Sequence, residues 1–537
     1  MKLKKLSVLA VCLLTGTSLM LGGCSGGTKA PAGEKILRVA TGAEPESLDP
    51  RKGGGTPEGY VLRQIFEGLT TQDAKGAAVP GAAERWEISP DGLTYKFYLR
   101  TNAKWSNGDP VTAKDFEAAW KTVLSPEFGS RAAEQLYCIK NGEAYNKKQV
   151  SAEQVGVRAL DEKTLEVTLE YPTPYFLSLA AYHAFYPVQQ KTAESNAKWS
   201  TDPQTTVGNG PFKIVKWEHN NKIQLVKNDQ YWNKDVVKLA KVDLYLADNY
   251  QTILNMFESR QVDTVEVSPP SAEIPRLLKE NKLKTSPFLV TYFYALNTTR
   301  PPFDNVKVRK AFGLALDRKA IVDSVTKGGE KPALAWIPFG LPDAQAGSDF
   351  RQTGGDLYGN NEVETARKLL AEAGYPDGKG LPPVTLLFNT NEFNKAIAEA
   401  VQEMWRKNLG VTVQLMNQEW KVYLQTRNSG DYQVARNGWL GKYSDPMTFL
   451  EGITTGNSNN YMRWSNPEYD RLVKEAQTSN DSAARMKAMH TAEKILVDEM
   501  PVIPIYFYTN KIMEQPNVKG IIRDALGAFY LREADVQ

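Results

Sequence analysis

The chain has 537 residues, of which 65 are basic and 62 are acidic. Three of its lysines lie within the first five residues, and without them the numbers of basic and acidic residues are equal. This balance argues against nucleic acid or an anionic membrane surface as the partner. The length exceeds what one hydrophobic core supports, so two or three domains are expected.

The first residues have the pattern of a secretion signal. MKLKK is followed by an apolar run from Leu6 to Leu21, shorter than the ~20 apolar residues of a spanning helix. This order predicts a signal peptide over residues 1–23. The LGGC sequence ending at Cys24 resembles a bacterial lipobox, which implies cleavage before Cys24 and attachment of palmitate or a similar acyl chain. Residues 25–35 have the composition of a flexible tether.

Cysteine usage predicts a fold without an internal disulfide. Cys12 would leave with the signal peptide and Cys24 would carry the lipid, so Cys138 remains alone.

The search for catalytic chemistry yields little. His183, His219 and His490 do not lie at metal-ligand spacing, and the chain has no H-E-x-x-H, C-x-x-C or phosphate-binding loop. One G-x-S-x-G, from Gly23 to Gly27, lies in the lipobox and tether rather than in a strand–turn–helix elbow. We therefore expect a protein that is not an enzyme and has no cofactor or metal. Unrecognised carboxylate pairs leave a hydrolase as a residual possibility.

The predicted elements begin with a strand over 35–43 and a β-rich region around 84–120, whose Pro-Asp-Gly and Asn-Gly pairs indicate turns. From 361 onward, helical and strand periodicities alternate. The expected elements are a helix over 361–374, a strand over 383–389, a helix over 392–410, a strand over 411–417, a short helix over 419–430 and a strand over 432–440.

Two of these helices have a clear apolar face and a clear end. The first places Val363, Ala366, Leu369, Leu370 and Ala373 on one side, and Gly374 with Pro376 ends it. The second aligns Phe393, Ile397, Val401 and Met404, and Gly410 ends it.

This alternation predicts a mainly parallel sheet with helices on both faces. Because ligands bind such sheets at the carboxyl ends of the strands, Gly438 and Trp439 are expected to face a cleft. Nearby, Asp445 is predicted to cap a helix that starts at Pro446, rather than to contact a ligand.

Several stretches resemble the extracellular solute-binding proteins of the oligopeptide ABC-importer class, the family that also serves dipeptides, nickel and opines. They occur in the family's order and cover nearly the whole mature chain. They are ESLDP, IFEGL, AKWSNGDPVTAKDF, TYFYALNTTRPPFDNVKVRKAF, LLAEAGYPDG, NQEWKVYL, VARNGW, YSDPMTFL and VIPIYFY.

The resemblance implies an α/β, two-lobed fold of the periplasmic-binding-protein type II class. The first lobe would comprise 24–67, 192–293 and 510–537, with 68–191 as an inserted domain. The second lobe would be 294–509. The chain would cross between the lobes near Tyr292–Tyr294 and Tyr506–Asn510. An extended peptide would bind between the lobes through main-chain hydrogen bonds, and the lobes would close on it.

The resemblance also implies ligand-binding residues. Arg436, Gly438, Trp439 and Leu440 would belong to the strand that pairs with the ligand. Arg427, and Asn394 in place of a histidine, would meet the carboxylate of ligands of particular length. Trp420 and Tyr508 would form aromatic pocket walls, and Tyr292 would lie in a hinge strand. Core packing remains an alternative for Trp420 and Tyr508, as does a solvated helix-end cation for Arg427.

Three positions depart from the family pattern. Lys442 replaces the aspartate that holds the ligand's α-ammonium, Gly54 replaces an acid, and Ala132 replaces a tyrosine near the amine. A lysine beside an ammonium repels it by ~1–4 kcal/mol. Alternatively, Lys442 extends to solvent and another acid replaces the aspartate.

These observations leave three hypotheses. The first is a lipid-anchored, monomeric oligopeptide-binding protein on the outer side of the cell membrane, delivering its ligand to an ABC importer. The second keeps that role for another solute, such as an N-blocked or anionic peptide, a sugar derivative or a chelate. The third is a lipid-anchored hydrolase.

Overall fold

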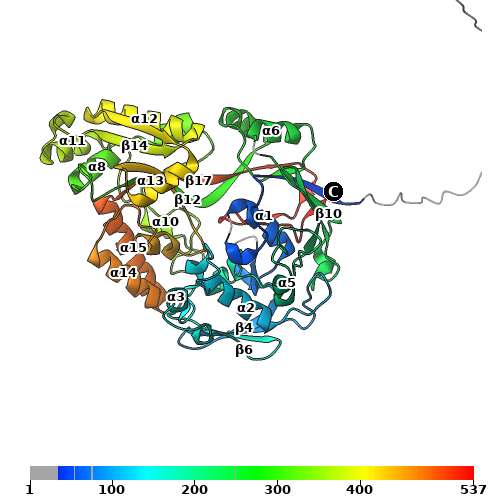
Figure 1. Cartoon of the computed structure of the whole chain (residues 1–537). Coiled ribbons are helices and arrows are strands. Elements are labelled where there is room, and N and C mark those ends of the chain that lie inside the picture. Colours follow the sequence, from blue (N-terminus) through cyan, green and yellow to red (C-terminus); the bar gives the residue numbers. More distant parts are fainter. Residues whose placement is uncertain (1–33, 54, 74–75, 248) are drawn as a thin grey trace, which may run out of the picture. The chain divides into compact units, whose positions relative to one another are not determined.

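The structure is a computed structural model that describes residues 34–53, 55–73, 76–247 and 249–537 (Figure 1). The predicted signal peptide, Cys24, the tether up to residue 33, and Gly54 lie outside these ranges. Within them, no helix combines the length and the apolar character that crossing a bilayer requires.

The largest sheet of the described chain has eleven strands and runs through both halves of the sequence. Ten of these strands follow one order, and the eleventh, β13 (Lys331–Pro332), pairs with β17 outside that order. The main order is β15 (Val413–Gln418), β14 (Val384–Asn389), β16 (Val434–Leu440), β12 (Lys284–Leu296), β17 (Val502–Glu514), β11 (Thr264–Val265), β1 (Ile36–Gly42), β10 (Lys241–Leu246), β9 (Lys222–Lys227) and β8 (Phe212–Glu218).

This sheet is mixed, which corrects the expectation of a mainly parallel one. Strands β15, β14 and β16 are parallel, as predicted, and so are β1, β10 and β11. However, β16, β12 and β17 pair antiparallel. The long central strands, each of 13 residues, carry less obvious periodicity than the helix–strand alternation after 361, so sequence alone did not reveal them.

The ladder between β12 and β17 contains a wide bulge. Pro287 pairs with Thr509, and Thr291 pairs with Phe507, so residues 288–290 lie opposite the single residue Tyr508. Bulges often occur beside functional sites because they re-aim a side chain, and proline within a sheet is tolerated at such interruptions. The register therefore changes where β17 presents Tyr508.

A separate four-stranded sheet contains the predicted β-rich region. The Pro-Asp-Gly turn forms as expected, with the Gly92 N–H donating to the Ser89 carbonyl at 2.8 Å. The end of this region is helix α2 (Ala113–Leu124) rather than strand. The order is β4 (Ala83–Ile88), β5 (Thr94–Leu99), β7 (Thr164–Thr168) and β6 (Val157–Ala159).

Three small two-stranded sheets complete the β structure of the described residues. They are β2 (Thr70–Gln72) with β3 (Ala78–Pro80), β18 (Val518–Lys519) with β21 (Asp535–Val536), and β19 (Ile522–Arg523) with β20 (Phe529–Tyr530).

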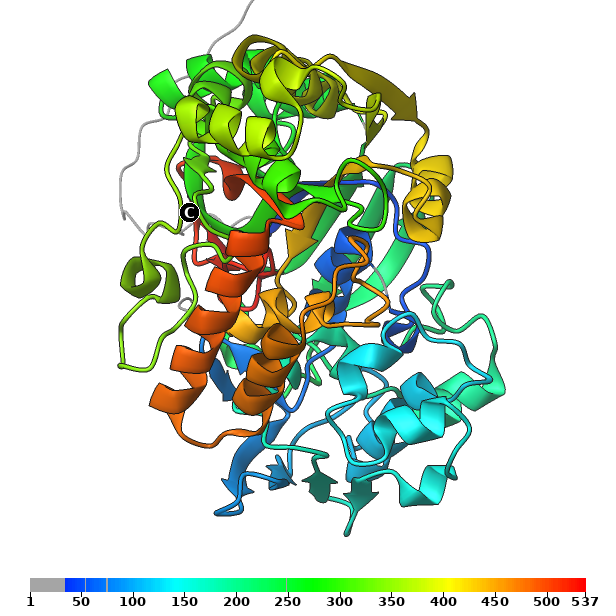
Figure 2. The ribbon, with the colours of Figure 1, turned by 90° about the vertical axis from the view of Figure 1, so that its left-hand side faces the viewer.

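Most helices lie against the faces of these sheets, and α14 and α15 lie side by side in Figure 2 as two orange helices. Besides α2, they are α1 (Thr56–Ile65), α3 (Gly142–Asn146), α4 (Phe176–Leu179), α5 (Gln190–Ser195), α6 (Tyr250–Glu258), α7 (Ile274–Lys279), α8 (Val306–Leu314), α9 (Arg318–Ile321), α10 (Phe350–Gly354), α11 (Val363–Glu372), α12 (Glu392–Leu409), α13 (Trp420–Ser429), α14 (Pro467–Thr478) and α15 (Ser482–Glu499).

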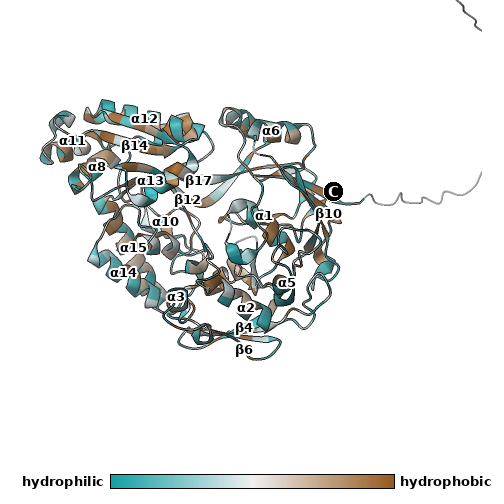
Figure 3. Ribbon diagram, viewed as in Figure 1, coloured by the Kyte–Doolittle hydropathy of each residue, from teal (hydrophilic) through white to brown (hydrophobic). Residues whose placement is uncertain are grey.

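The predicted helices and strands after residue 361 form within a few residues of their expected ends. Figure 3 shows β14 as largely hydrophobic, whereas α12 mixes hydrophilic and hydrophobic turns. The buried face of α12 is centred on Ile397, Val401 and Trp405, with Phe393 and Met404 at its margins. Full burial of such an aliphatic side chain contributes ~1.5–3 kcal/mol. Gly410 ends α12 with φ 69°, as predicted.

The predicted cap at Asp445 is confirmed. Its Oδ1 accepts from the Met447 N–H at 2.9 Å, at the start of a short 3-10 helix over Pro446–Phe449. Arg485 also donates to both carboxylate oxygens, each at 2.7 Å. With these partners, Asp445 is 5% exposed and has a structural role.

The expected domain limits stay predictions. The four-stranded sheet lies wholly within the predicted insertion, 68–191, and β14 to β16 lie wholly within the predicted second lobe, 294–509. The two predicted crossings fall in β12 and β17.

Candidate functional site

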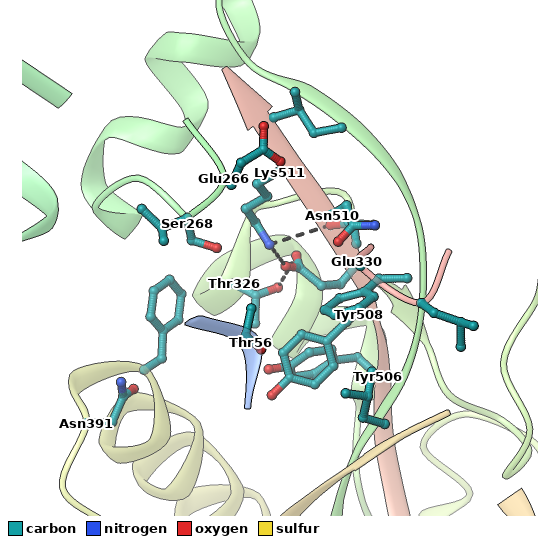
Figure 4. Close-up of a pocket in the computed structure, with 18 of the residues that line it drawn as sticks. Thr56, Glu266, Ser268, Thr326, Glu330, Asn391, Tyr506, Tyr508, Asn510 and Lys511 are labelled. Carbon is teal, nitrogen blue, oxygen red and sulfur yellow. Dashed lines mark hydrogen bonds and ion pairs between the residues drawn. The ribbon is translucent and has the colours of Figure 1, made fainter. Parts of the chain in front are cut away.

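A cavity of about 660 Å³ lies beside strands β16 and β17, and we call it the main cavity. Figure 4 shows part of its wall, with Tyr506 and Tyr508 on the long strand β17. Segments from both predicted lobes line it. The lining residues used below are Thr56, Tyr250, Glu266, Thr326, Glu330, Asn389, Asn394, Trp420, Arg436, Leu440, Tyr506, Tyr508, Lys511, Arg523, Asp524, Leu526, Gly527 and Ala528.

Strand β16 sends alternate residues to opposite sides, as a pleated strand must. Arg436, Gly438 and Leu440 are half-buried or exposed, and Arg436 and Leu440 line the main cavity. Trp439 points the other way and is 9% exposed. Its indole N–H donates to the Thr448 carbonyl at 2.8 Å. The predicted residues of this strand therefore lie on two sides. Arg436, Gly438 and Leu440 lie on the side of the main cavity, and Trp439 lies on the other side.

Two tyrosines contact Arg436, and a third packs against one of them. Its Nη2 donates to the Tyr508 hydroxyl at 2.9 Å, and its guanidinium lies 4.6 Å from the ring centre of Tyr292. Tyr506 stacks on Tyr292 with ring centres 4.9 Å apart. Burial is the main reason that the pKa of Tyr292 lies well above its usual value. Burial likewise raises the pKa of Tyr506, so the hydroxyls of Tyr292 and Tyr506 stay protonated and can donate hydrogen bonds.

Large apolar side chains remain uncovered at the main cavity. Trp420 is 48% exposed, Tyr250 47% and Leu440 46%. Trp420 stacks on Tyr423 at 5.7 Å and leaves its outer face to the cavity. Aromatic rings provide a large contact area at little entropic cost, so this wall suits a ligand that covers it.

The free edge of β16 is a second feature of this wall. Strand β14 pairs only with Val434 and Ala435, whereas β12 pairs with β16 as far as Leu440. Residues 436–440 thus have no strand partner opposite β12 within the described chain. Gly438 is exposed and has no side chain to cover this edge. Two backbone groups there have side-chain partners, since the Gly438 N–H donates to Asn437 Oδ1 at 3.0 Å and the Arg436 carbonyl accepts from the Tyr423 hydroxyl. Such an edge can accept an extended chain as an added strand.

Two ion pairs lie at the cavity wall, and the sequence did not indicate them. Arg523 Nη2 contacts Glu266 Oε1 at 2.6 Å. Lys511 Nζ contacts Glu330 Oε1 at 2.5 Å, with side chains only 6% and 4% exposed (Figure 4). Thr326 also donates to Glu330 at 2.8 Å. Burial alone would raise the pKa of Glu330, but the Lys511 ammonium holds that pKa below its usual value.

Lys442 does not line the main cavity. It is half-buried and lines a smaller cavity of about 160 Å³, which we call the side cavity. It also borders a third cavity that contains Trp439 and Glu451. The main and side cavities are adjacent, because they share Thr56, Leu440, Asp524, Leu526, Gly527 and Ala528.

The remaining predicted residues are more scattered. Asn394 lines the main cavity, and its Oδ1 accepts from the Tyr292 hydroxyl at 3.3 Å. Arg427 does not line this cavity. It donates to Asn437 at 3.2 Å and lies 3.9 Å from the ring centre of Tyr461. Ala132 is buried beside Gly53.

The structure therefore brings Arg436, Leu440, Trp420, Asn394 and Tyr508 to one cavity, with Gly438 beside them. Ligand contacts by any of these residues stay predictions. The acidic and basic pairs at the wall were missed because their partners are far apart in sequence. The only signal was the position of Lys511 and Arg523 just after the predicted crossing.

Comparisons with known proteins identify the family and the fold. A family described as bacterial extracellular solute-binding proteins, family 5 Middle, matches residues 77–461. The oligopeptide-binding protein OppA of Bacillus subtilis is 42% identical over 536 residues, 98% of this chain and 96% of the relative. The dipeptide-binding protein DppE of the same organism is 41% identical, covering 99% of each chain.

Solved structures show the same fold. The murein tripeptide binding protein MppA of Escherichia coli matches with a TM-score of 0.81 at 37% identity, over 94% of this chain and 99% of that one. Peptide-bound OppA of Listeria monocytogenes matches with a TM-score of 0.80 at 31% identity, over 94% and 100%. The predicted mixed α/β, two-lobed fold is confirmed by these matches.

Proposed function

We propose a peptide ligand for this chain, which belongs to the bacterial extracellular solute-binding proteins of family 5. The protein would capture oligopeptides in the main cavity outside the cytoplasm and deliver them to an ABC importer. The relatives named for oligopeptides and dipeptides support this assignment.

The free edge of β16 at residues 436–440 carries the proposal. A peptide could add to this edge through its main chain, which all peptides share. The uncovered rings of Trp420 and Tyr250 would then cover its side chains. Recognition through the main chain and broad apolar walls suits a receptor for peptides of varied sequence.

Mass spectrometry of material that copurifies with the protein, followed by calorimetry with tripeptides and tetrapeptides, tests the proposal. We expect a mixture of peptides. Saturation at 100 times the Kd should add ~2.7 kcal/mol of stability, and small-angle scattering should show compaction on binding. A radius unchanged at saturation would contradict closure, and turnover without a stable ligand would indicate a hydrolase.

A different solute remains the second candidate because of Lys442. A cation at the position where the family has an ammonium-binding acid favours an N-blocked or anionic peptide, a sugar derivative or a chelate. One defined small molecule in the copurified material, in place of mixed peptides, would support this candidate.

We also propose that a lipid on Cys24 anchors the protein to the outer side of the cell membrane. The support is the LGGC sequence that ends at this cysteine. Cys24→Ser should abolish acylation and leave the precursor uncleaved, as judged by fractionation and mass spectrometry. Normal cleavage and membrane retention of the variant would contradict the anchor.

A further inference from the structure

The side cavity is lined by residues that the sequence assigns to three different parts of the fold. Leu440 to Lys442 come from the predicted second lobe, Ser178 to His183 from the predicted insertion, and Arg63 and residues 524–530 from the predicted first lobe. An occupant would therefore contact all three.

The cations of this cavity form no ion pair within the described chain. Neither Arg63 nor Lys442 forms one with any residue that the structure describes, although both are half-buried. In the main cavity, by contrast, Arg523 and Lys511 are both paired with glutamates, and Arg436, which has no acidic partner among the described residues, donates to the Tyr508 hydroxyl. Among the described residues that line the side cavity, the one carboxylate is that of Asp524, which is 6% exposed and attracts Arg63 without forming an ion pair.

Several buried polar atoms at this cavity also lack hydrogen-bond partners. Asp524 Oδ1 accepts from the Leu526 and Ala528 N–H groups at 3.0 and 2.8 Å, but its Oδ2 accepts from none. Ser178 Oγ and both ring nitrogens of His183 are likewise unpartnered. Buried polar groups are normally satisfied, so such a concentration points to a polar occupant. Ser178 and His183 can donate to an anionic occupant, whereas the unpartnered Asp524 oxygen is an acceptor and does not contribute to holding one.

We propose that the side cavity binds a carboxylate of the ligand, held by Lys442 and Arg63. This inference rests on the proposed peptide function. Two cations and one carboxylate leave one positive charge without compensation, which an incoming carboxylate would neutralise. Hydrogen bonds from charged donors to a carboxylate are about twice as strong as neutral ones.

The neutral groups suit the same occupant. Burial, together with the charge of Arg63, lowers the pKa of His183 to about 3, so the imidazole is uncharged near neutral pH. It can donate one hydrogen bond, and so can Ser178. The volume of about 160 Å³ corresponds to roughly five water molecules at ~30 Å³ each. This accommodates a carboxylate on a short stem.

Glu451 is the competing partner for Lys442, because both border the third cavity. Burial raises the pKa of the Glu451 carboxyl, and Lys442 opposes that rise. The two groups do not form an ion pair, so the Lys442 ammonium remains available to the side cavity.

Calorimetry with a small peptide panel tests the inference. The panel contains Ala-Ala-Ala, its carboxyl-terminal amide, and tripeptides with Glu or Gln at the first or third position. Each comparison removes one carboxylate from the peptide, either by amidating the chain end or by replacing Glu with Gln at the first or third position. We expect one of these replacements to weaken binding to the wild type about tenfold or more. In the Lys442→Gln/Arg63→Gln double variant, the same exchange should change affinity less than about twofold. The replacement that weakens binding shows whether the bound carboxylate belongs to a peptide side chain or to the carboxyl end of the peptide.

Lys310→Gln is the matched control, because this half-buried lysine on α8 also forms no ion pair with the described residues and lines neither cavity. If the double variant unfolds, the single Lys442→Gln variant should still reduce the discrimination. The inference is overturned if peptides bind but no exchange affects the wild type, or if the variants discriminate equally. If no peptide binds the wild type, the proposed function fails and this inference with it.

Discussion

The main cavity and the side cavity share six lining residues, yet they differ in how their charges are partnered. In the main cavity, Lys511 and Arg523 are bound to glutamates. In the side cavity, Lys442 and Arg63 have no such partner within the described chain. Charges that are already paired stabilise the wall and contribute little selectivity, whereas unpaired cations are available to a ligand. Among the described residues, Arg436 in the main cavity is not bound to an acid either, but Tyr508 and Tyr292 contact its guanidinium. The comparison therefore concerns Lys442 and Arg63 against Lys511 and Arg523, and it assigns charge selection to the side cavity.

The largest expected difference is in stability. Lys511→Met should lower the free energy of unfolding by ~3–5 kcal/mol, because it leaves Glu330 buried without its counter-charge. Lys442→Met should change it by less than ~0.5 kcal/mol, because no ion pair is broken. Urea denaturation of both variants measures this. The Lys511→Met/Glu330→Gln double variant should recover part of the loss. Equal losses of unfolding free energy in Lys511→Met and Lys442→Met would contradict the proposed difference between the two cavities.

A pH effect should come from the side cavity. His183 has a folded pKa of about 3, against ~6.5 when unfolded, so the unfolded chain binds a proton first as pH falls. Stability should therefore be fully present above pH 6.5 and decline between pH 6.5 and 3, by ~2 kcal/mol from pH 7 to pH 5.

The comparison of wild type with His183→Gln isolates this effect, with His219→Gln, whose ring is exposed, as control. Glu330 does not interfere between pH 7 and pH 5. Its lowered pKa contributes stability that is lost only as pH falls below its ordinary value of 4.5. Parallel pH profiles for wild type and His183→Gln would contradict the prediction.

The apolar wall of the main cavity should affect binding more than folding. Trp420→Ala should weaken tripeptide binding by ~1–2 kcal/mol and change stability by under ~1 kcal/mol, because almost half of the ring is exposed. Val422→Ala is the control, since this residue is 49% exposed on the same helix and lies outside the cavity. Calorimetry and thermal unfolding separate the two effects. Equal losses of affinity in both variants would argue against a ligand on this wall.

The last effect concerns ligand preference and the charge at residue 442. Lys442→Asp should shift preference toward peptides with a free α-ammonium by ~1 kcal/mol or a few times that. The measurement is the affinity for one peptide in free and N-acetylated forms. If the wild type already binds the free form much more tightly and the variant does not differ, Lys442 points to solvent and another group holds the amine.

Much of the local structure could be predicted from sequence because its causes are local. The alternation after residue 361 fixed α11 to β16, and Gly410 and Asp445 marked helix ends through their own backbone and side-chain chemistry. The antiparallel central strands could not be predicted in this way. Their pairing joins residues about 150 to 220 positions apart, which no local period encodes.

The candidate site was predictable in part for the same reason. Pleating determines that Arg436 and Leu440 share a side and that Trp439 does not, and this could have been deduced once β16 was placed. That Lys442 and Arg63 form no ion pair with the described residues could not be deduced from the sequence. It depends on which acids approach from segments hundreds of residues away, so only the folded chain reveals it.

The bulge opposite Tyr508 has a mechanical consequence. Three residues of β12 face one residue of β17 there. Regular pairing continues from Pro287 back to Lys284, and on the other side Thr291 and Tyr292 pair before a second irregularity ahead of Phe293. A twist of one half of the ladder against the other can be absorbed by the backbone torsions of residues 288–290, without breaking the flanking hydrogen bonds. The elastic weak point of the long strands thus coincides with a residue of the main-cavity wall, so bending the sheet and reshaping the binding surface become one motion.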